Sequence, residues 1–337
     1  MKVSILLPTY NRSVSGYLQK SIKSVISQSF KNWELFVIDD ASSDETAEVV
    51  SQFNKFDSRI RLFKMEENTG LPALNSLVAF ELITGGWIAW QFDDCVWESN
   101  HLAHLLNAAE KSPNSGIIYG QARVILKYGS TIIGENFDKL NLNTRNLIPN
   151  CAALIKYQVF NEVGWVDPHI LLKRNNDHDF WIRASKKFDF TFVEEVLATE
   201  YGPSLENSIG NSVSLFPELS KRYMEISRDE NLGFLNSDEK SIFESFDWMS
   251  DLEKTQLAFI TIEHLNRGGN LKNVWKLLFS IFGFDTSLIS DVQNVTHAHM
   301  EEILLKVFEL NRNTIMINNI RLDEQQRYID EQQRSKS

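Results

Sequence analysis

Apolar runs of strand length alternate with amphipathic stretches of helix length over the first 112 residues, and this alternation constrains the fold most strongly. Repeated strand–helix units of this size build a parallel sheet with helices on both faces. We therefore expect an α/β fold with a mostly parallel sheet flanked by helices. The expected strands cover residues 3–8, 33–39, 60–65 and 87–92, and the expected helices cover 17–28, 44–53, 71–82 and 99–110.

Acidic clusters lie where these patterns end or begin. Asp39 and Asp40 follow the second strand, Asp93 and Asp94 follow the fourth, and the segment 176–179 (Asn-Asp-His-Asp) opens a helix pattern. Ligands of open α/β sheets collect at the carboxyl ends of the strands, so these clusters predict one shared site. Carboxylates brought together repel one another unless a cation lies between them, and hard oxygen ligands favour Mg²⁺ or Mn²⁺. The alternative for any single pair is a turn or a helix cap.

The pattern changes twice along the remaining chain. Between residues 116 and 214 we expect strands at 116–127, 131–135 and 190–193, with helices at 153–163 and 178–188. After residue 215 only helical patterns follow. The sequence therefore predicts a domain over residues 1–214, with halves of about 1–112 and 113–214, and a helical region over 215–337. The helices expected in that region cover 216–228, 237–248, 251–267, 270–282 and 297–331.

Composition narrows the class of protein. The chain has 337 residues and 43% hydrophobic residues, enough for the core of a soluble enzyme. A net charge of −11 argues against nucleic-acid binding and against a polybasic membrane anchor. No apolar run is long enough to span a bilayer, and a strand is expected where a signal peptide would lie, so we expect a cytoplasmic protein. Cys95 and Cys151 lack metal-binding spacing and are expected to be reduced thiols.

Several ordered motifs carry a family resemblance. The motifs are VSILLPTYNR at 3–12, QSFKNWEL at 28–35, IDDASSDET at 38–46, NTGLPALN at 68–75, QFDD at 91–94 and NDHDFWIR at 176–183. In order and spacing they resemble the family 2 inverting glycosyltransferases, and the resemblance covers about residues 2–210.

The resemblance implies a transferase of the GT-A type whose donor is a nucleotide-diphosphosugar, most favourably a UDP-sugar. The donor would lie across residues 1–112 and the acceptor across 113–214. Thr9 and Asp39 match positions that hold the base, and Pro8 and Tyr10 shape that pocket. A carboxylate accepts from an imide N–H, which suits Asp39 to uracil, with a strand-end cap as the alternative.

Two further segments extend the implied donor site. Asn68 and Gly70 resemble a loop that approaches the donor, with ordinary turn residues as the alternative. Asp94 matches the principal ligand of a divalent metal, Mn²⁺ or Mg²⁺, and Asp93 matches a contact to the donor ribose or to metal-bound water. Gln91 replaces the first carboxylate of the family's metal motif. One carboxylate, two diphosphate oxygens and waters can complete an octahedron, so we expect weak metal affinity without nucleotide.

The same resemblance assigns the chemistry of the acceptor side. Inverting transfer needs a base that removes the acceptor hydroxyl proton, and Asp177 matches that base. Asp179 lies four residues before Arg183 and is expected to be an ion-pair partner or a helix-end charge. Trp165 resembles a residue beside the acceptor that stacks on a sugar face, with a core tryptophan as the alternative.

Together these patterns predict an inverting, metal-dependent glycosyltransferase that acts on a hydroxyl of a glycan or glycolipid, in surface-polysaccharide synthesis. Peripheral contact with the inner face of the membrane is compatible with this role. An inactive scaffold that acts through its helical C-terminus is the alternative from a different class. A nucleotidyltransferase is disfavoured, because residues 8–15 lack the glycine-rich phosphate loop such an enzyme needs.

A seven-residue repeat lies near the end of the chain. DEQQR occurs at residues 323–327 and again at 330–334, in phase with the apolar residues Phe308, Ile315, Leu322 and Ile329. This spacing predicts a coiled-coil segment that pairs with a second copy or with another enzyme of the same pathway. The alternative is a solvated polar tail.

Overall fold

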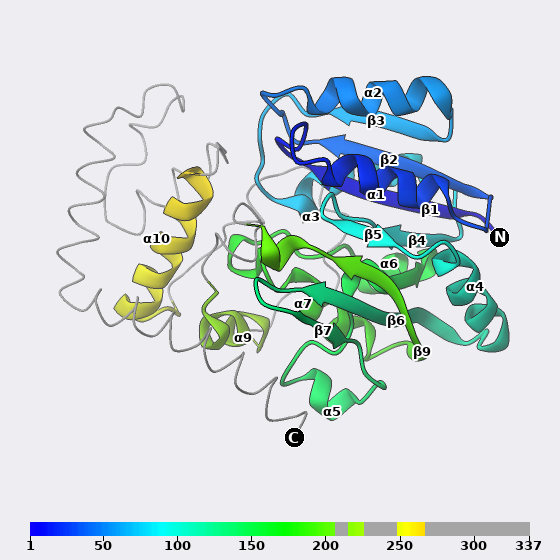
Figure 1. Cartoon of the computed structure of the whole chain (residues 1–337). Coiled ribbons are helices and arrows are strands. Elements are labelled where there is room, and N and C mark those ends of the chain that lie inside the picture. The colour runs from blue at the N-terminus through cyan, green and yellow to red at the C-terminus, as the bar shows by residue number, and fades with distance from the viewer. Residues whose placement is uncertain (206–214, 226–247, 267–337) are drawn as a thin grey trace.

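The computed structural model describes residues 1–205, 215–225 and 248–266. In these residues the strands form one curled sheet with the order β3-β2-β1-β4-β8-β6-β9-β5, and β7 pairs with β6 at the side (Figure 1). Strands β1 to β4 are parallel, and β8 joins β4 and β6 in antiparallel fashion. The strands are β1 (Val3–Thr9), β2 (Trp33–Asp39), β3 (Ile60–Lys64), β4 (Trp87–Trp90), β5 (Cys95–Trp97), β6 (Ser115–Ile125), β7 (Ser130–Ile133), β8 (Ala153–Lys156) and β9 (Asp189–Glu200).

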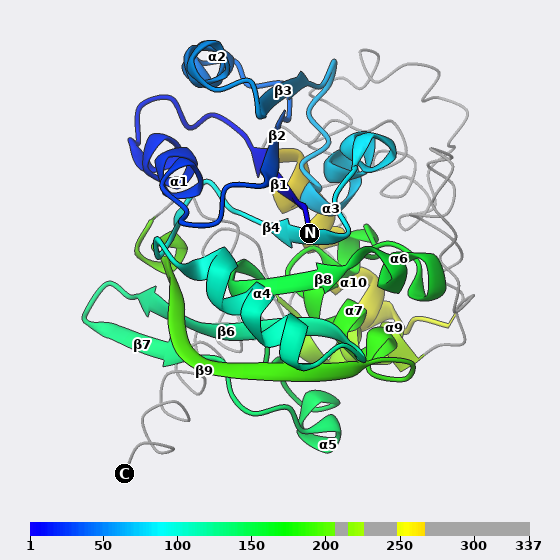
Figure 2. The same ribbon diagram turned by 90° about the vertical axis from the view of Figure 1, so that its right-hand side faces the viewer.

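Helices cover both faces of this sheet, and Figure 2 shows α1 and α6 on opposite sides of β1 and β4. No helix of the described residues is long and apolar enough to cross a membrane. The helices are α1 (Tyr17–Ile26), α2 (Thr46–Phe56), α3 (Pro72–Asn75), α4 (His101–Lys111), α5 (Lys139–Leu142), α6 (Tyr157–Val163), α7 (Asn176–Ala184), α9 (Pro217–Glu225) and α10 (Asp251–Asn266), with 3-10 turns η1 (Ser76–Leu82), η2 (Asn150–Ala152), η3 (Ile170–Leu172) and η4 (Gly202–Ser204).

Strand β1 shows why an apolar run, Ile5 to Leu7, forms its centre. Ile5 and Leu7 point into one core, which α1 and α4 complete, while Leu6 points into a second core that η1, α6 and α7 complete. All seven residues of β1 are buried. Successive side chains alternate between the two faces of a strand, so a parallel strand covered on both faces needs apolar residues at every position.

The fold class expected from the sequence is confirmed, and most element positions agree with it. Three details differ. The helix expected at 153–163 begins as strand β8, because Leu154 and Ile155 pair with β6. Strand β9 continues past Val193 to Glu200, since it pairs with both β6 and β5, although exposed glutamates interrupt its apolar pattern. The helix expected at 71–82 divides into one α turn and a 3-10 segment.

Two short strands, β5 and β8, were not expected from the sequence. A strand of three or four residues leaves too little periodicity to recognise, and pairing with neighbours is what makes these segments extended. The helices expected at 270–282 and 297–331, nearly all of 237–248, and the seven-residue repeat lie outside the described residues. The domain boundary near residue 214 stays a prediction.

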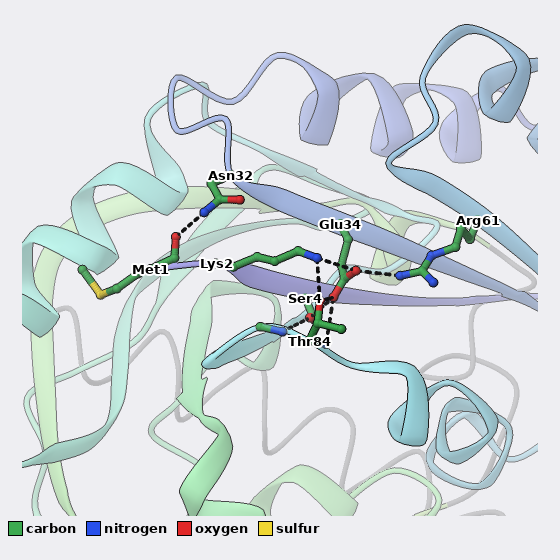
Figure 3. Close-up of polar contacts among 8 residues, drawn as sticks. Met1, Lys2, Ser4, Asn32, Glu34, Arg61 and Thr84 are labelled. Atoms are coloured by element: carbon green, nitrogen blue, oxygen red, sulfur yellow. Dashed lines mark hydrogen bonds and ion pairs between the residues drawn. The ribbon is translucent and has the colours of Figure 1, made fainter.

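The amino-terminal edge of the parallel strands carries a saturated carboxylate (Figure 3). Glu34 Oε2 accepts from Lys2 Nζ at 2.8 Å and from Arg61 Nη2 at 2.6 Å. Its Oε1 accepts from Ser4 Oγ at 2.6 Å and from the Thr84 amide and hydroxyl at 3.0 and 2.9 Å. Burial alone would raise the pKa of Glu34, but these donors lower it to about 2. The carboxylate therefore joins β1, β2, β3 and the 84–85 turn.

Candidate functional site

The carboxyl end of β2 places a buried carboxylate with an unused oxygen. Asp39 has no exposed surface, and its Oδ1 accepts from the Ser42 amide at 3.1 Å. Its Oδ2 is buried without a hydrogen-bond partner. A buried unpaired acceptor costs free energy in the absence of a ligand, which makes this oxygen a candidate contact for a bound donor group.

Asp40, the next residue, holds a neighbouring loop in place. Its carboxylate accepts from the Thr69 and Gly70 amides, each at 2.8 Å. Burial raises the pKa of Asp40, and these hydrogen bonds oppose that rise. Gly70 has φ +61°, a conformation that L side chains rarely adopt. The amide nitrogen and oxygen of Asn68 are both buried without a partner, so this loop brings a second unsatisfied side chain to the edge of β2.

The end of β4 joins the end of β1 through Asp93. Thr9 Oγ1 donates to Asp93 Oδ2 at 2.8 Å, and Arg12 Nε donates to Oδ1 at 3.2 Å. Burial raises the pKa of Asp93, and the Arg12 guanidinium opposes that rise. Both oxygens of Asp93 are therefore positioned by β1 and the loop after it. Pro8 is buried and Tyr10 half-buried on either side of Thr9.

Asp94 lies near Glu200, a carboxylate that the sequence patterns did not indicate. Burial and the Asp93 charge raise the pKa of Asp94 to about 7. Burial, followed by the charges of Asp94 and Asp177, raises the pKa of Glu200 to about 7. A methyl group on Gly202 would lie 2.7 Å from Asp94 Oδ2 and 3.5 Å from Glu200 Oε1, so both carboxylates approach the same backbone. Their repulsion favours a proton or a cation here.

The two candidate carboxylates on α7 have different surroundings. Asp177, in the first turn, accepts from Asn146 Nδ2 at 2.8 Å, and burial raises its pKa. Asp179 is 1% exposed and accepts from Arg183 Nε at 2.9 Å, while the same guanidinium donates to the Val163 carbonyl at 2.7 Å. Asp179 is thus the expected ion-pair partner inside the core. Asp177 is the α7 carboxylate within electrostatic reach of Glu200.

The expectation that Trp165 stacks on a sugar is corrected. Its side chain has no exposed surface, and its Nε1 donates to the Ala73 carbonyl at 2.6 Å. The ring packs against Phe80 and Trp90, with centroids 4.9 and 5.3 Å away. A ring enclosed in this way cannot offer a face to a ligand, so the core alternative holds.

Gln91 also lies away from the acidic site. It has no exposed surface and its Nε2 donates to Ser24 Oγ of α1 at 3.1 Å. Asp93 and Asp94, two and three residues later, are the side chains that reach the site. The replacement of a carboxylate at position 91 therefore removes no charge from the cluster formed by Asp93, Asp94 and Glu200.

Glu200, Arg12 and Asn146 were not predicted as site residues. The signal for Glu200 was its position at the end of an extended segment, but the expected strand ended at 193. Arg12 stands within the 3–12 motif and had been given no role. Asn146 comes from a loop whose approach to α7 depends on tertiary packing.

Residues 4–165 match the family model described as glycosyl transferase family 2. This chain carries a family 2 glycosyltransferase domain. The match includes the ends of β1, β2 and β4, with Thr9, Asp39, Asp93 and Asp94.

Curated relatives agree with this assignment. An uncharacterized glycosyltransferase of Rickettsia felis is 29% identical over 208 residues, which are 58% of this chain and 33% of that protein. The glucosyltransferase WfgD of Escherichia coli, named for transfer from UDP-Glc to GlcNAc-diphosphoundecaprenol, is 33% identical over 150 residues, 44% of this chain and 56% of that protein. The chain spans about a third of the length of the R. felis relative.

Solved structures share the fold of the glycosyltransferase domain. S. aureus TarS 1-349 in complex with UDP-GlcNAc superposes with a TM-score of 0.55 at 15% identity, covering 87% of this chain and 89% of that one. At this identity the likeness concerns the fold, and it supports the GT-A class expected from the sequence.

The residues at the site suit a divalent cation held together with a ligand. Asp94 offers hard carboxylate oxygens, and its repulsion with Asp93 and Glu200 would fall if a cation entered. In the part of the chain that the structure describes, no group of three or more His, Cys, Asp and Glu side chains is arranged to hold a metal ion. Asp94 is thus the carboxylate that would hold a cation together with oxygens of a bound ligand.

Proposed function

We propose that the domain is an inverting, metal-dependent glycosyltransferase that moves a sugar from a UDP-sugar to a hydroxyl of a glycan or glycolipid. The observation that carries this proposal is the convergence of Asp94, from the turn after β4, and Asp177, from α7, on Glu200, with Asp93 beside Asp94. The family match gives this cluster its chemical context.

The end of β2 supports uracil as the donor base. Uracil presents one imide N–H between two carbonyl oxygens. Among the described residues, Asp39 has one oxygen without a partner, because the Ser42 amide donates to the other. Guanine presents two adjacent N–H groups, which suit a carboxylate with both oxygens available. A single available carboxylate oxygen therefore favours UDP over GDP.

Asp94 is proposed to hold Mn²⁺ or Mg²⁺ together with the diphosphate of the donor and water. When bound, the metal would stabilise the charge that develops on the departing diphosphate. Arg12 and Thr9 keep Asp93 in a fixed orientation beside Asp94, where it is proposed to contact the donor ribose or metal-bound water.

Asp177 is proposed to remove the proton of the acceptor hydroxyl as its oxygen attacks the anomeric carbon opposite the diphosphate. Among the described residues, Asn146 and the His178 amide donate to it, whereas the Arg183 guanidinium holds Asp179. A partly exposed carboxylate with a raised pKa is a stronger base than an ordinary one. The proton moves to Asp177, and the carbon–phosphate oxygen bond breaks with inversion.

The setting is proposed from the relatives. WfgD is named for a lipid-linked acceptor, and TuaG of Bacillus subtilis, 33% identical over 30% of this chain and 38% of its own, is named as a putative teichuronic acid biosynthesis glycosyltransferase. We propose surface-polysaccharide synthesis as the setting of this chain, with the inner face of the membrane as its place of action.

A panel of UDP- and GDP-sugars, each with Mn²⁺, with Mg²⁺ and with EDTA, tests the proposal. We expect metal-dependent hydrolysis or transfer with a UDP-sugar, and NMR of the transfer product should show an inverted anomeric centre. An inactive scaffold would show neither reaction with any donor. A preference for GDP-sugars would reject the base assignment.

A further inference from the structure

The two helices beyond the expected domain boundary pack directly on the segment that precedes the proposed base. Ile170 and Leu171 of η3 share a buried apolar cluster with Leu219 of α9 and with Leu257 and Ile260 of α10. Both helices contact η3, and Figure 1 shows α9 and α10 on the same side of the domain. These helices are therefore part of the core that surrounds η3.

A buried polar contact crosses the same interface. Lys173 is 7% exposed and His264 is fully buried, and Lys173 Nζ lies 3.0 Å from His264 Nδ1. An ammonium group has no acceptor, so Nδ1 accepts the hydrogen bond. A buried ammonium without such acceptors is costly, which disfavours packing arrangements that separate α10 from Lys173.

Helix α9 adds two more contacts. Ser220 Oγ donates to the Leu171 carbonyl at 3.2 Å. Tyr223 OH donates to Asp167 Oδ2 at 3.2 Å, and its ring stacks on His169 with centroids 4.3 Å apart. The segment from 167 to 173 is thus held by side chains from both helices.

This segment leads without a break into α7. The Asn175 amide donates to the Leu172 carbonyl at 2.8 Å, and the Asp179 amide donates to the Asn175 carbonyl at 3.0 Å. Asp177 lies within the second of these hydrogen-bonded turns. A shift of η3 along α10 would move the first turn of α7 with it.

The same cluster also includes Leu71, which follows the loop that Asp40 holds beside β2. The apolar packing of α9 and α10 therefore reaches both sides of the site. The buried polar contact at Lys173 lies on the α7 side.

We propose that Lys173 and His264 are positioning residues that fix the register of η3 on α10 and thereby orient Asp177. The inference rests on the proposed role of Asp177 as the base. Helices α9 and α10 would then help to orient the acceptor side of the site, and the domain would depend on them for its activity.

The test compares His264→Leu with His264→Gln in the full chain. The glutamine oxygen can still accept from Lys173, whereas leucine cannot. We expect His264→Leu to lower kcat by about tenfold, because small misplacements of reacting groups slow a reaction by this much or more. The UDP dissociation constant should stay unchanged within about twofold. His264→Gln should recover most of this loss.

Arg222→Ala is the matched control. It breaks the exposed Arg222–Glu253 ion pair between α9 and α10 and should leave kcat unchanged.

Hydrogen exchange of the amides at residues 176–179 provides a readout that does not need turnover. We expect faster exchange there in His264→Leu than in the unaltered chain, and no change in Arg222→Ala. If the unaltered chain has no transferase activity, the proposed function fails while this comparison still decides the positioning role.

Two results would overturn the inference: unchanged exchange in His264→Leu, or a fall in UDP affinity as large as the fall in kcat. If His264→Leu does not fold, Tyr223→Phe replaces it, because it removes the hydrogen bond to Asp167 and keeps the ring. The same readouts then apply, with a smaller expected fall in kcat of roughly threefold.

Discussion

The two edges of the parallel sheet carry buried carboxylates of opposite character. At the amino-terminal edge, Glu34 is saturated by two cations and three further donors, and its pKa is lowered to about 2. At the carboxyl edge, Asp94 and Glu200 lie near like charges, and the pKa of each is raised to about 7. A carboxylate with all its hydrogen bonds made stabilises the fold. Carboxylates that repel one another destabilise it, and a bound cation would reduce that repulsion.

The largest effect should come from the acceptor side of the carboxyl edge. Asp177→Asn should lower kcat by about two to four orders of magnitude while UDP affinity and folding stability stay unchanged, because the amide cannot accept the proton. Initial rates and UDP titration calorimetry measure the two quantities. Asp179→Asn is the comparison variant: if it keeps fold and donor affinity yet lowers kcat more than Asp177→Asn, the base assignment is wrong.

The next effect concerns the metal. UDP binding should tighten with Mn²⁺ or Mg²⁺, and Asp94→Asn should remove most of that enhancement, a change of roughly 100-fold, because a neutral amide is a poorer ligand than a carboxylate. Titration calorimetry with metal and with EDTA measures it. Equal UDP affinity under both conditions in the unaltered chain would contradict the metal assignment.

At the opposite edge the expected effect is on stability. Glu34→Gln replaces a buried acceptor of five hydrogen bonds with an amide that also carries donors toward Lys2 and Arg61. The free energy of unfolding should fall by about 2 kcal/mol, the cost of leaving such groups poorly paired. Urea denaturation measures this change. UDP affinity should not change, and a loss of UDP affinity without a loss of stability would break the distinction between the two edges.

The smallest effect is the pH dependence of the difference in unfolding free energy between the unaltered chain and Glu34→Gln. The folded pKa of Glu34 is about 2 against an ordinary 4.5, so the unfolded chain binds its proton first as the pH falls. The stabilisation is therefore fully present above about pH 4.5 and is lost as the pH falls toward 2. Unfolding free energies of the unaltered chain and Glu34→Gln should converge over this window. Parallel curves would show that Glu34 is not the titrating group.

Much of the donor side could be predicted from sequence because its residues stand at the ends of apolar runs. Thr9 and Asp39 are the last residues of their strands, Asp94 comes shortly after β4, and parallel strands end at one edge of a sheet. The acceptor side was harder to predict. Glu200 ends a strand whose exposed glutamates hide its periodicity. A tryptophan such as Trp165 suits either a protein core or a surface on which a sugar stacks, so the sequence does not distinguish the two.

What the sequence by itself determined is the class of fold, the order of the parallel strands along the chain, and the acidic residues at their ends. These follow from local rules, since hydrophobic periodicity and strand-end position can be read without knowing which segments meet. The tertiary structure alone decided which carboxylates are satisfied. Asp179 forms an ion pair with Arg183, and Glu34 forms ion pairs with Lys2 and Arg61. Asp94 lies near Glu200, although 106 positions separate them in the sequence. The pKa of a buried carboxylate depends on its neighbours in space, so identical side chains became structural at one edge and strained at the other.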